Sequence, residues 1–377
     1  MTAARQNWLD SIRWQSDFYL RGLKRQRTDL EFEWDWFSES QLGGGGGVKM
    51  LAKRALSRLP MRSRWNKASQ YSMAWIEQNA GVLWQARSHL DDDLSKLLFD
   101  QQLVLRATSY EQYYYPRIDF EDFVSVVSKS PFESSDLPTT YLGLPLFRFT
   151  LRVPSRSSTP ELTIISTRSQ VQLLNSYRQY FVRRSEFDST PRPGDVVIDC
   201  GACIGEISLL FAGLVGESGE VHMFDPVPLH ARFCELQGEL NPKVRGALRI
   251  NALAVGDATK EQSGGTRTDS SSIAPGGLAI DSFSVTTLDD YVTKHKVRRV
   301  DVIKMDIEGA EVPALAGASQ LIRDFRPTLT ISAYHRQDDL WVIPERIKSL
   351  NPRYRLYFGH HSPVLYESVY YAADPQR

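Results

Sequence analysis

The alternation of apolar and polar positions is most regular near the middle of the chain. An apolar run at 196–198 ends in an acid, Asp199, and a glycine-bounded turn follows at 201–205. Apolar positions at helical spacing continue over 207–215, and a second apolar run ends in another acid, Asp225. This pattern predicts a strand, a tight turn, a helix and a second strand. Such a unit begins a doubly wound α/β sheet.

The same alternation continues to the end of the chain. We expect strands near 195–200, 220–225, 247–253, 300–306, 327–333, 354–358 and 367–373. We expect helices near 204–215, 228–240, 287–295, 310–323 and 338–350. The interval 257–282 is rich in Gly, Ser and Thr and is predicted to form a long loop.

The first half of the chain has a different pattern. Helical spacing predicts an N-terminal arm within 1–42 and helices near 48–59, 70–86, 91–106 and 170–184, while 141–166 reads as a β-hairpin. Five consecutive glycines at 43–47 predict a linker. We therefore predict three segments: an arm with its linker (1–47), a helical accessory region ending in the hairpin (48–168), and a cofactor-binding domain (169–377).

Composition narrows the classes of function. The 377 residues carry a formal net charge of zero, with 42% hydrophobic and 24% charged residues. This balance is typical of a globular protein and gives no support for general nucleic-acid binding. The longest apolar stretch, 196–216, contains Asp199 and Glu206, so we expect no membrane span. The N-terminus lacks a secretory leader pattern, which predicts a cytoplasmic protein.

The first turn limits the kind of cofactor. Ligands of doubly wound sheets bind beyond the carboxyl ends of the strands. A dinucleotide site requires G-x-G-x-x-G, whereas this turn has two glycines, Gly201 and Gly205, followed by Glu206, which would repel a pyrophosphate. S-adenosylmethionine carries a sulfonium and an ammonium, which acids attract. Asp225 is placed to hold its ribose hydroxyls. A turn without any cofactor would explain the glycines but not the acids.

Five segments together resemble the FkbM-type S-adenosylmethionine-dependent methyltransferases: DVVIDCGACIGE (195–206), VHMFDP (221–226), NALAVGD (251–257), TLDDY (287–291) and VIKMDIEGAE (302–311). The resemblance covers about 170–375. It implies a class I methyltransferase fold, with a Rossmann-like sheet between helices on both faces. It also implies O-methylation of hydroxyls on sugars, glycans or secondary metabolites. Cofactor contacts are then expected from Asp199, Gly201, Ala202, Gly205, Glu206, Asp225, Val255, Asp257 and Asp306.

Methyl transfer from a sulfonium is an in-line displacement, so the acceptor must lie about 3–3.5 Å from the methyl carbon. A base assists a hydroxyl acceptor. Asp306 ends the fourth predicted strand and is expected near the cofactor or acceptor. His335, just after the fifth strand, is our first candidate for the base, and His361 is the second. Glu311 is expected to cap the following helix or to pair with a basic residue rather than to reach the site.

Other interpretations stay open at this point. Asp306, Glu308 and a histidine could bind a divalent cation that activates the acceptor, although the sequence does not require a metal. The fold could serve as a binding module or scaffold without turnover, or, against the evidence of the turn, as a nicotinamide-dependent oxidoreductase. The expected partner is a small-molecule or glycan acceptor. The N-terminal region is expected to select that acceptor or to form a homo-oligomer.

Overall fold

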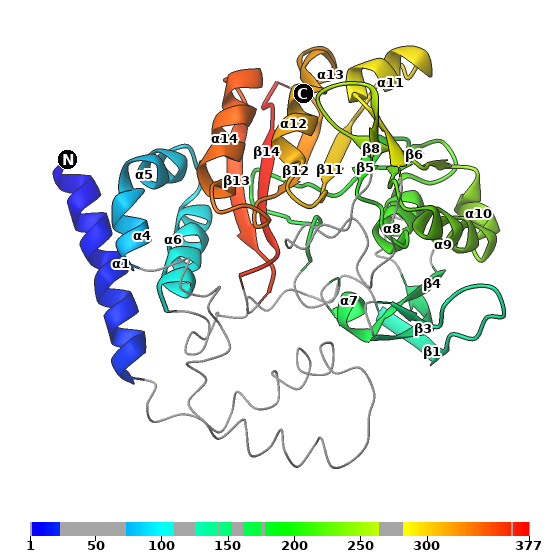
Figure 1. Cartoon of the computed structure of the whole chain (residues 1–377), viewed down its shortest axis with the longest axis horizontal. Helices are drawn as coiled ribbons and strands as arrows, with labels where there is room; N and C mark the ends of the chain where they lie inside the picture. The colour runs from blue at the N-terminus through cyan, green and yellow to red at the C-terminus, as the bar shows by residue number, and fades with distance from the viewer. Residues whose placement is uncertain are drawn as a thin grey trace.

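The computed structural model describes residues 2–22, 73–108, 125–141, 144–152, 161–172, 174, 178–263, 282–362 and 365–376. The predicted helix near 48–59, the glycine run at 43–47 and most of the predicted loop at 257–282 lie outside these residues. Figure 1 shows an α/β core with the first helices at one side and a smaller set of strands at the other.

A seven-stranded sheet forms the centre, in the order β13-β14-β12-β11-β5-β6-β7. Its strands are β5 (Val196–Cys200), β6 (Glu220–Phe224), β7 (Leu248–Asn251), β11 (Val302–Met305), β12 (Thr328–Ser332), β13 (Arg355–His360) and β14 (Ser368–Ala373). The first five are parallel, and β14 runs antiparallel to both β12 and β13. All seven predicted strands are therefore confirmed. Strand order reverses between β5 and β11, which places a ligand crevice at their carboxyl ends.

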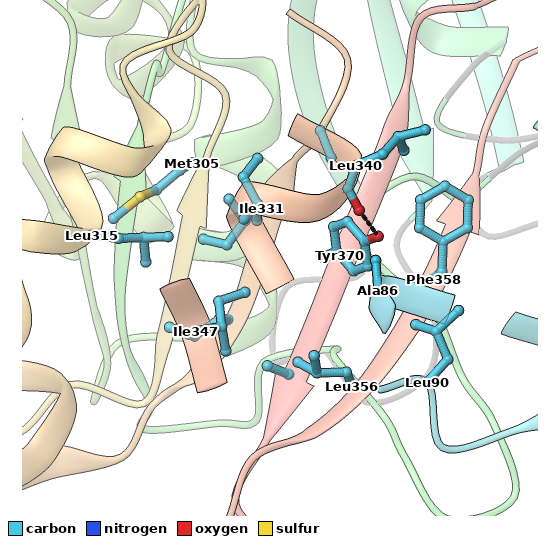
Figure 2. Close-up of a cluster of buried hydrophobic side chains, with 14 of the residues drawn as sticks. Ala86, Leu90, Met305, Leu315, Ile331, Leu340, Ile347, Leu356, Phe358 and Tyr370 are labelled. Atoms are coloured by element: carbon cyan, nitrogen blue, oxygen red, sulfur yellow. Dashed lines mark hydrogen bonds between the residues drawn. The ribbon is translucent and has the colours of Figure 1, made fainter. Parts of the chain in front are cut away.

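Helices cover both faces of this sheet because neighbouring residues of a strand point to opposite faces. Val197 packs into one hydrophobic cluster with α8, and Ile198 into another with α12 and α14. The helices of the core are α8 (Glu206–Val215), α9 (Pro228–Glu239), α10 (Pro242–Arg245), α11 (Leu288–Lys294), α12 (Glu311–Ala316), α13 (Ser319–Phe325) and α14 (Asp339–Leu350). Figure 2 shows Met305, Leu315 and Ile331 in the second cluster.

The helix predicted at 310–323 is two helices, α12 and α13, with a break at Gly317. A β-carbon at Gly317 would lie 2.1 Å from the backbone oxygen of Gly256. The chain therefore turns at a point where another segment lies against its backbone. The predicted helix at 70–86 is also divided, at Asn79, into two shorter helices. Periodicity alone does not show either break.

The first helices pack on the outer strand of the sheet. They are α1 (Ala3–Gly22), α4 (Met73–Gln78), α5 (Ala80–Ser88) and α6 (Asp93–Thr108). Asp91 accepts a hydrogen bond from the Leu356 amide at 2.8 Å, and the Ser95 hydroxyl accepts one from the Phe358 amide at 2.9 Å. Ala86 and Leu90 lie beside Leu356 and Phe358 in Figure 2. These helices satisfy an exposed strand edge and share the core of the sheet. The domain boundaries at 47 and 168 stay a prediction.

A second sheet contains the predicted hairpin. It consists of β1 (Ser125–Pro131), β2 (Thr140–Tyr141), β3 (Leu144–Arg152) and β4 (Glu161–Thr167). Gln237 of α9 exchanges two hydrogen bonds with the backbone of Ile165, and Asn241 does the same with Thr163. These side chains join the second sheet to the helices of the core.

The helix predicted at 170–184 is wrong for its last part, 178–184. The structure has a short helix, α7 (Arg168–Gln172), and residues 178–184 are not helical. Tyr180 has a positive φ of 68°. Its hydroxyl is directed to Asp306, 2.8 Å away. A distant carboxylate therefore determines the local backbone, which helical periodicity cannot indicate.

A third, small sheet was not predicted. It pairs β8 (Ala254–Val255) and β9 (Lys260–Ser263) with β10 (Ser282–Thr286), so the start of the interval expected to be a loop is a strand. Val255 is buried at the end of β8. None of the helices that the structure describes has the length and apolar character needed to cross a bilayer.

The packing of α6 on β13 can be tested. Phe99 is fully buried, with its ring 5.5 Å from that of Phe358 in an edge-on arrangement. We expect Phe99→Ala to lower the free energy of unfolding by about 3–5 kcal/mol, because it leaves a cavity. Leu97→Ala is the matched control, since Leu97 of the same helix is exposed, and it should change stability by less than about 0.5 kcal/mol. Urea unfolding measures both, and equal effects would contradict the shared core.

Candidate functional site

Two turns meet at the carboxyl ends of β5 and β11. Gly201 adopts φ 83°, and the Asp306 amide donates to the Cys200 carbonyl at 3.0 Å. A β-carbon at Gly201 would lie 1.9 Å from the backbone oxygen of Asp306. Gly201 is therefore required by the contact between the two turns. The sequence predicted a close approach at this glycine, but to a cofactor rather than to the protein backbone.

Lys304 and Asp199 form a buried ion pair across the two strands. The Lys304 ammonium lies 2.9 Å from Asp199 Oδ1 and donates to the Gly201 carbonyl at 2.7 Å. The Ser208 hydroxyl donates to the other oxygen of Asp199 at 2.5 Å. Although burial opposes a charge on Lys304, the Asp199 carboxylate holds the pKa of this ammonium above its usual value. Asp199 thus helps to fix the turn after β5, because it holds the Lys304 ammonium that binds the Gly201 carbonyl.

Sequence analysis did not identify Lys304, although a signal was present. It is the ionisable residue within the apolar run of β11, where a charge is expected only if it has a partner. Because residues 199 and 304 are far apart in sequence, the identity of that partner required the strand order.

Asp225 lies at the end of β6 and already has several partners. Its carboxylate accepts from the Cys203 amide at 3.0 Å and from the Val227 amide at 2.9 Å. The Nδ1 atom of His230 lies 2.9 Å from the same oxygen that Val227 contacts. On its other side, His230 meets the hydroxyl of Tyr141 at 3.2 Å. Oδ2 of Asp225 can therefore accept one more hydrogen bond. These contacts also place His230 and Tyr141, neither of which was predicted, beside the expected cofactor position.

Glu206 begins α8 directly after the left-handed Gly205. Its side chain is buried, and its Oε2 atom has no hydrogen-bond partner among the described residues. Burial raises the pKa of Glu206 to about 7, although the charges of Lys304 and His230 act in the opposite direction. A buried acceptor without a donor is costly. The position therefore suits a ligand that brings a donor or a positive charge.

The other residues predicted to contact the cofactor differ in their burial and in their contacts. Ala202 is buried, and its amide donates to the Phe224 carbonyl at 3.0 Å, beside the Asp225 corner. A β-carbon at Gly205 would lie 3.0 Å from the sulfur of Cys234, so this glycine serves helix packing. Val255 pairs with Thr286 in the small sheet, and Asp257 is exposed, 3.9 Å from Lys260.

Asp306 is held by hydroxyl groups from two separate segments. The Tyr180 hydroxyl donates to Oδ2 at 2.8 Å and the Tyr334 hydroxyl to Oδ1 at 2.9 Å. His335 Nε2 lies 3.3 Å from Oδ1. Burial disfavours the carboxylate, but the hydrogen bond and charge of His335 lower the pKa of Asp306 below its usual range. Asp306 is thus a fixed anion at the crevice, as expected, and the two tyrosines were not predicted.

His335 lies between carboxylates on both sides of its ring. Nδ1 is 2.9 Å from Glu311 Oε1, and Nε2 faces Asp306 and, at 3.8 Å, Glu308. Burial acts against a charged imidazole, but Asp306 and Glu311 raise the pKa of His335 to about 11. A protonated ring cannot accept a proton. These contacts disfavour a free imidazole that titrates near neutral pH, and the role of His335 as the base stays a prediction.

Glu311 and His361 have structural contacts. Glu311 accepts a hydrogen bond from the Ile307 amide at 2.9 Å, at the start of α12, which is the capping role that was expected. His361 is buried, with Nε2 2.8 Å from the Tyr371 hydroxyl, and that hydroxyl accepts from the Tyr180 amide at 3.3 Å. His361 is therefore linked to Asp306 through two residues, Tyr371 and Tyr180.

A pocket of about 410 Å³ lies at the opposite edge of the sheet. Its walls include Val196, Glu220 and Arg249, at or near the amino ends of β5, β6 and β7, together with His295 and Arg298 beyond α11. It is therefore separated from Asp225 and Asp306 by the length of the strands.

The contact between the turns predicts a stability effect. We expect Gly201→Ala to destabilise the fold by several kcal/mol, about 3 or more, because the new methyl group overlaps the Asp306 backbone and φ is positive. Gly246→Ala is the control, since that glycine has φ −61° and its β-carbon would meet nothing within 4 Å. Thermal unfolding compares the two. A stable Gly201→Ala protein would contradict the close contact.

Glu206 predicts a pH dependence of stability. Its pKa is raised from 4.5 to about 7 in the folded protein, so the folded state retains the proton longer than the unfolded chain. Stability should fall as pH rises from about 4.5 to about 7, by at most about 3 kcal/mol from this group. We expect Glu206→Gln to remove that part of the loss in urea unfolding at a series of pH values. The exposed Glu217, changed to Gln, should leave the profile as in the wild type; parallel profiles for all three proteins would disprove the effect.

Comparison with known proteins gives one family match. Residues 199–361 match the model of the methyltransferase FkbM domain. A comparison with curated proteins gives no match. Among solved structures, the methyltransferase FkbM from Methylobacillus flagellatus KT is similar, with 20% sequence identity and a TM-score of 0.51. The match covers 79% of this chain and 60% of that chain, so this chain spans about 60% of the length of that relative.

Two further structures are similar at lower scores. Fibrillarin from Aeropyrum pernix, with natively bound S-adenosyl-L-methionine, is 10% identical with a TM-score of 0.33, over 66% of this chain and 99% of that one. The O-methyltransferase from Bacillus cereus in complex with SAH is 13% identical with a TM-score of 0.32, over 48% and 73%.

The fold similarity confirms the predicted class I methyltransferase sheet with helices on both faces. The family match contains Asp199, Gly201, Asp225, Asp306 and His335 within one continuous interval. Residues 199–361 of this chain thus match the methyltransferase FkbM domain, on a fold similar to that of a solved FkbM methyltransferase.

Proposed function

We propose that this protein transfers a methyl group from S-adenosylmethionine to a hydroxyl of a sugar, glycan or secondary metabolite. The observation that carries the proposal is the buried carboxylate of Glu206, which has an oxygen without a donor among the described residues. It occupies the helix start where a dinucleotide would place its pyrophosphate. An anion is repelled there, whereas the ammonium of S-adenosylmethionine would supply the missing donor.

Two regions of the crevice would hold the donor. Asp225 would take one ribose hydroxyl at its remaining acceptor position, with His230 and Tyr141 keeping the carboxylate in place. Glu206 would take the ammonium. The bound donor supplies an activated methyl group: its carbon–sulfur bond breaks as a carbon–oxygen bond to the acceptor forms, leaving S-adenosylhomocysteine and releasing the hydroxyl proton.

The acceptor would bind near Asp306. The hydroxyls of Tyr180 and Tyr334 fix this carboxylate, so its position is defined before an acceptor arrives. Glu308, whose side chain is 47% exposed, lies on the solvent side of the same cluster. Of the two acids, Glu308, whose pKa burial raises to about 7, is better suited to accept the hydroxyl proton than Asp306, whose pKa is lowered.

Residues before the family domain also reach this crevice. Tyr141 comes from β2, and Tyr180 comes from the segment after α7. We therefore infer that the N-terminal half shapes the acceptor site. A subunit contact through this half is a second role for the same region. The zero net charge gives no reason to propose a nucleic-acid substrate.

Turnover separates an enzyme from a binding scaffold. The full chain should be incubated with methyl-labelled S-adenosylmethionine and separate pools of sugars, glycans and small hydroxylated metabolites. Label transferred to one pool, with S-adenosylhomocysteine formed in equal amount, is the expected result. Tight binding of the methyl donor without turnover in any pool would favour the scaffold, and binding of a nicotinamide dinucleotide instead would overturn the cofactor assignment.

Asp225 gives the sharpest prediction about the donor. We expect Asp225→Ala to weaken S-adenosylmethionine binding by about 1–3 kcal/mol, because a charged acceptor for the ribose is lost. The control is Glu235→Ala, which removes an exposed acid of α9 that is paired with Arg232. Calorimetric titration measures both affinities, and circular dichroism verifies that the Cys203 turn is still folded. Unchanged affinity in a folded Asp225→Ala protein would place the donor elsewhere.

A further inference from the structure

Three side chains converge at the crevice from separate elements. Asp306 follows β11, Glu311 begins α12, and His335 follows β12. One ligand-type atom from each lies within 4.8 Å of the others. Sequence spacing suggested Asp306 and Glu308 as the acidic pair of a possible metal site. The structure instead groups Asp306 with Glu311, and Glu308 lies further out, 3.8 Å from the ring of His335.

The charges in this cluster are not balanced. Among the described residues, the carboxylates of Asp306, Glu308 and Glu311 lie within 4 Å of His335, which carries at most one positive charge. A fourth acid of the cluster, Asp339 at the start of α14, is 1% exposed, and its burial together with the charge of Glu311 raises its pKa to about 7. The group therefore has an excess of negative charge in a largely buried position.

Two buried oxygens of the cluster also have no hydrogen-bond donor within the part of the chain that the structure describes. They are Oε2 of Glu311 and Oδ1 of Asp339. The partner oxygens of the same carboxylates are used, by the Ile307 amide and the Arg336 amide respectively. Buried acceptors in native proteins are almost always satisfied. A cation bound at Glu311 would satisfy the first of these oxygens and would offset the excess charge.

The ligand types and their supports fit a divalent cation. Carboxylates and imidazole are ligands for Mn²⁺, and carboxylates for Mg²⁺. In an octahedral site with bonds of about 2.1 Å, neighbouring ligands are about 3.0 Å apart and opposite ligands about 4.2 Å. The three ligand atoms, which lie within 4.8 Å of one another, would therefore move closer together around a cation. Tyr180 and Tyr334 orient Asp306 through hydrogen bonds. Such outer contacts are characteristic of metal ligands.

We infer that Asp306, Glu311 and His335 bind one divalent cation of the Mn²⁺ or Mg²⁺ class. The cation takes the place of the proton on His335 and lies at the side of the crevice where the acceptor is proposed. This inference rests on the proposed function for its purpose, because a cation there would lower the pKa of the acceptor hydroxyl. The binding itself does not depend on turnover and can be measured without it.

The test uses the full chain, freed of metal by a chelator and titrated with Mn²⁺. Calorimetry and the electron paramagnetic resonance signal of free Mn²⁺ report binding. We expect one bound ion, and an affinity reduced by at least about 10–100-fold in both Glu311→Gln and His335→Ala, because loss of a mere outer contact already has an effect of that size. The control is Asp338→Asn, which changes a partly exposed acid in the loop after His335 and should leave the affinity as in the wild type. If Glu311→Gln does not fold, Asp306→Asn takes its place, because Asp306 is more exposed.

Two results would overturn the inference. One is the absence of saturable Mn²⁺ binding by the wild type, and the other is unchanged binding by folded Glu311→Gln and His335→Ala; either would assign a proton, not a metal, to the cluster. S-adenosylmethionine binding should be measured in parallel without Mn²⁺. If the donor binds and Mn²⁺ does not, the cation inference alone fails. If the donor binds neither with nor without Mn²⁺, the proposed function fails, whatever the metal result.

Discussion

The ion pair between Lys304 and Asp199 is the interaction on which the crevice depends. Both side chains are almost fully buried, so each charge would be costly without the other. Lys304 also donates to the carbonyl of Gly201, which ties the turn after β5 to strand β11. The contact between Gly201 and Asp306 then fixes the turn after β11. The Lys304–Asp199 pair therefore helps to position Asp306, although neither member of the pair needs to contact a ligand.

Elsewhere in the fold, side chains form hydrogen bonds with backbone amides at the edges of the sheets. Side chains of Asp91 and Ser95 satisfy amides on the outer edge of β13, and Gln237 and Asn241 do the same for β4. Edge amides without partners would invite pairing with other chains. The described N-terminal helices thus belong to the same cooperative core as the sheet. Their contribution to the crevice is indirect, because they hold β13, and β14 lies between β13 and β12.

The sequence predicted the sheet well because its central strands are buried on both faces and read as continuous apolar runs. It failed where distant groups decide the local conformation. Tyr180 leaves the predicted helix to reach Asp306, and the pairing of His335 with Glu311 joins the ends of two different elements. The acids Glu206, Asp225 and Asp306 were found as residues, but their partners were not. The sequence shows which strand end a side chain occupies. The protonation state of that side chain depends on neighbours from other strands, which sequence position does not identify.

The distribution of charge explains why a positively charged donor suits this crevice. The cation closest to the centre, Lys304, is already neutralised by Asp199, so it offers little attraction to an anion. Asp225 and Asp306 remain beyond the ends of β6 and β11, and Glu206 remains at the start of α8; in the proposed arrangement Asp225 lies at the donor's ribose. A sulfonium loses its charge when its methyl group leaves, so strong attraction would also favour the reactant over the transition state. A charged His335 or a bound cation beside Asp306 moderates that attraction. The cluster after β11 can therefore orient the acceptor while leaving the sulfonium free to react.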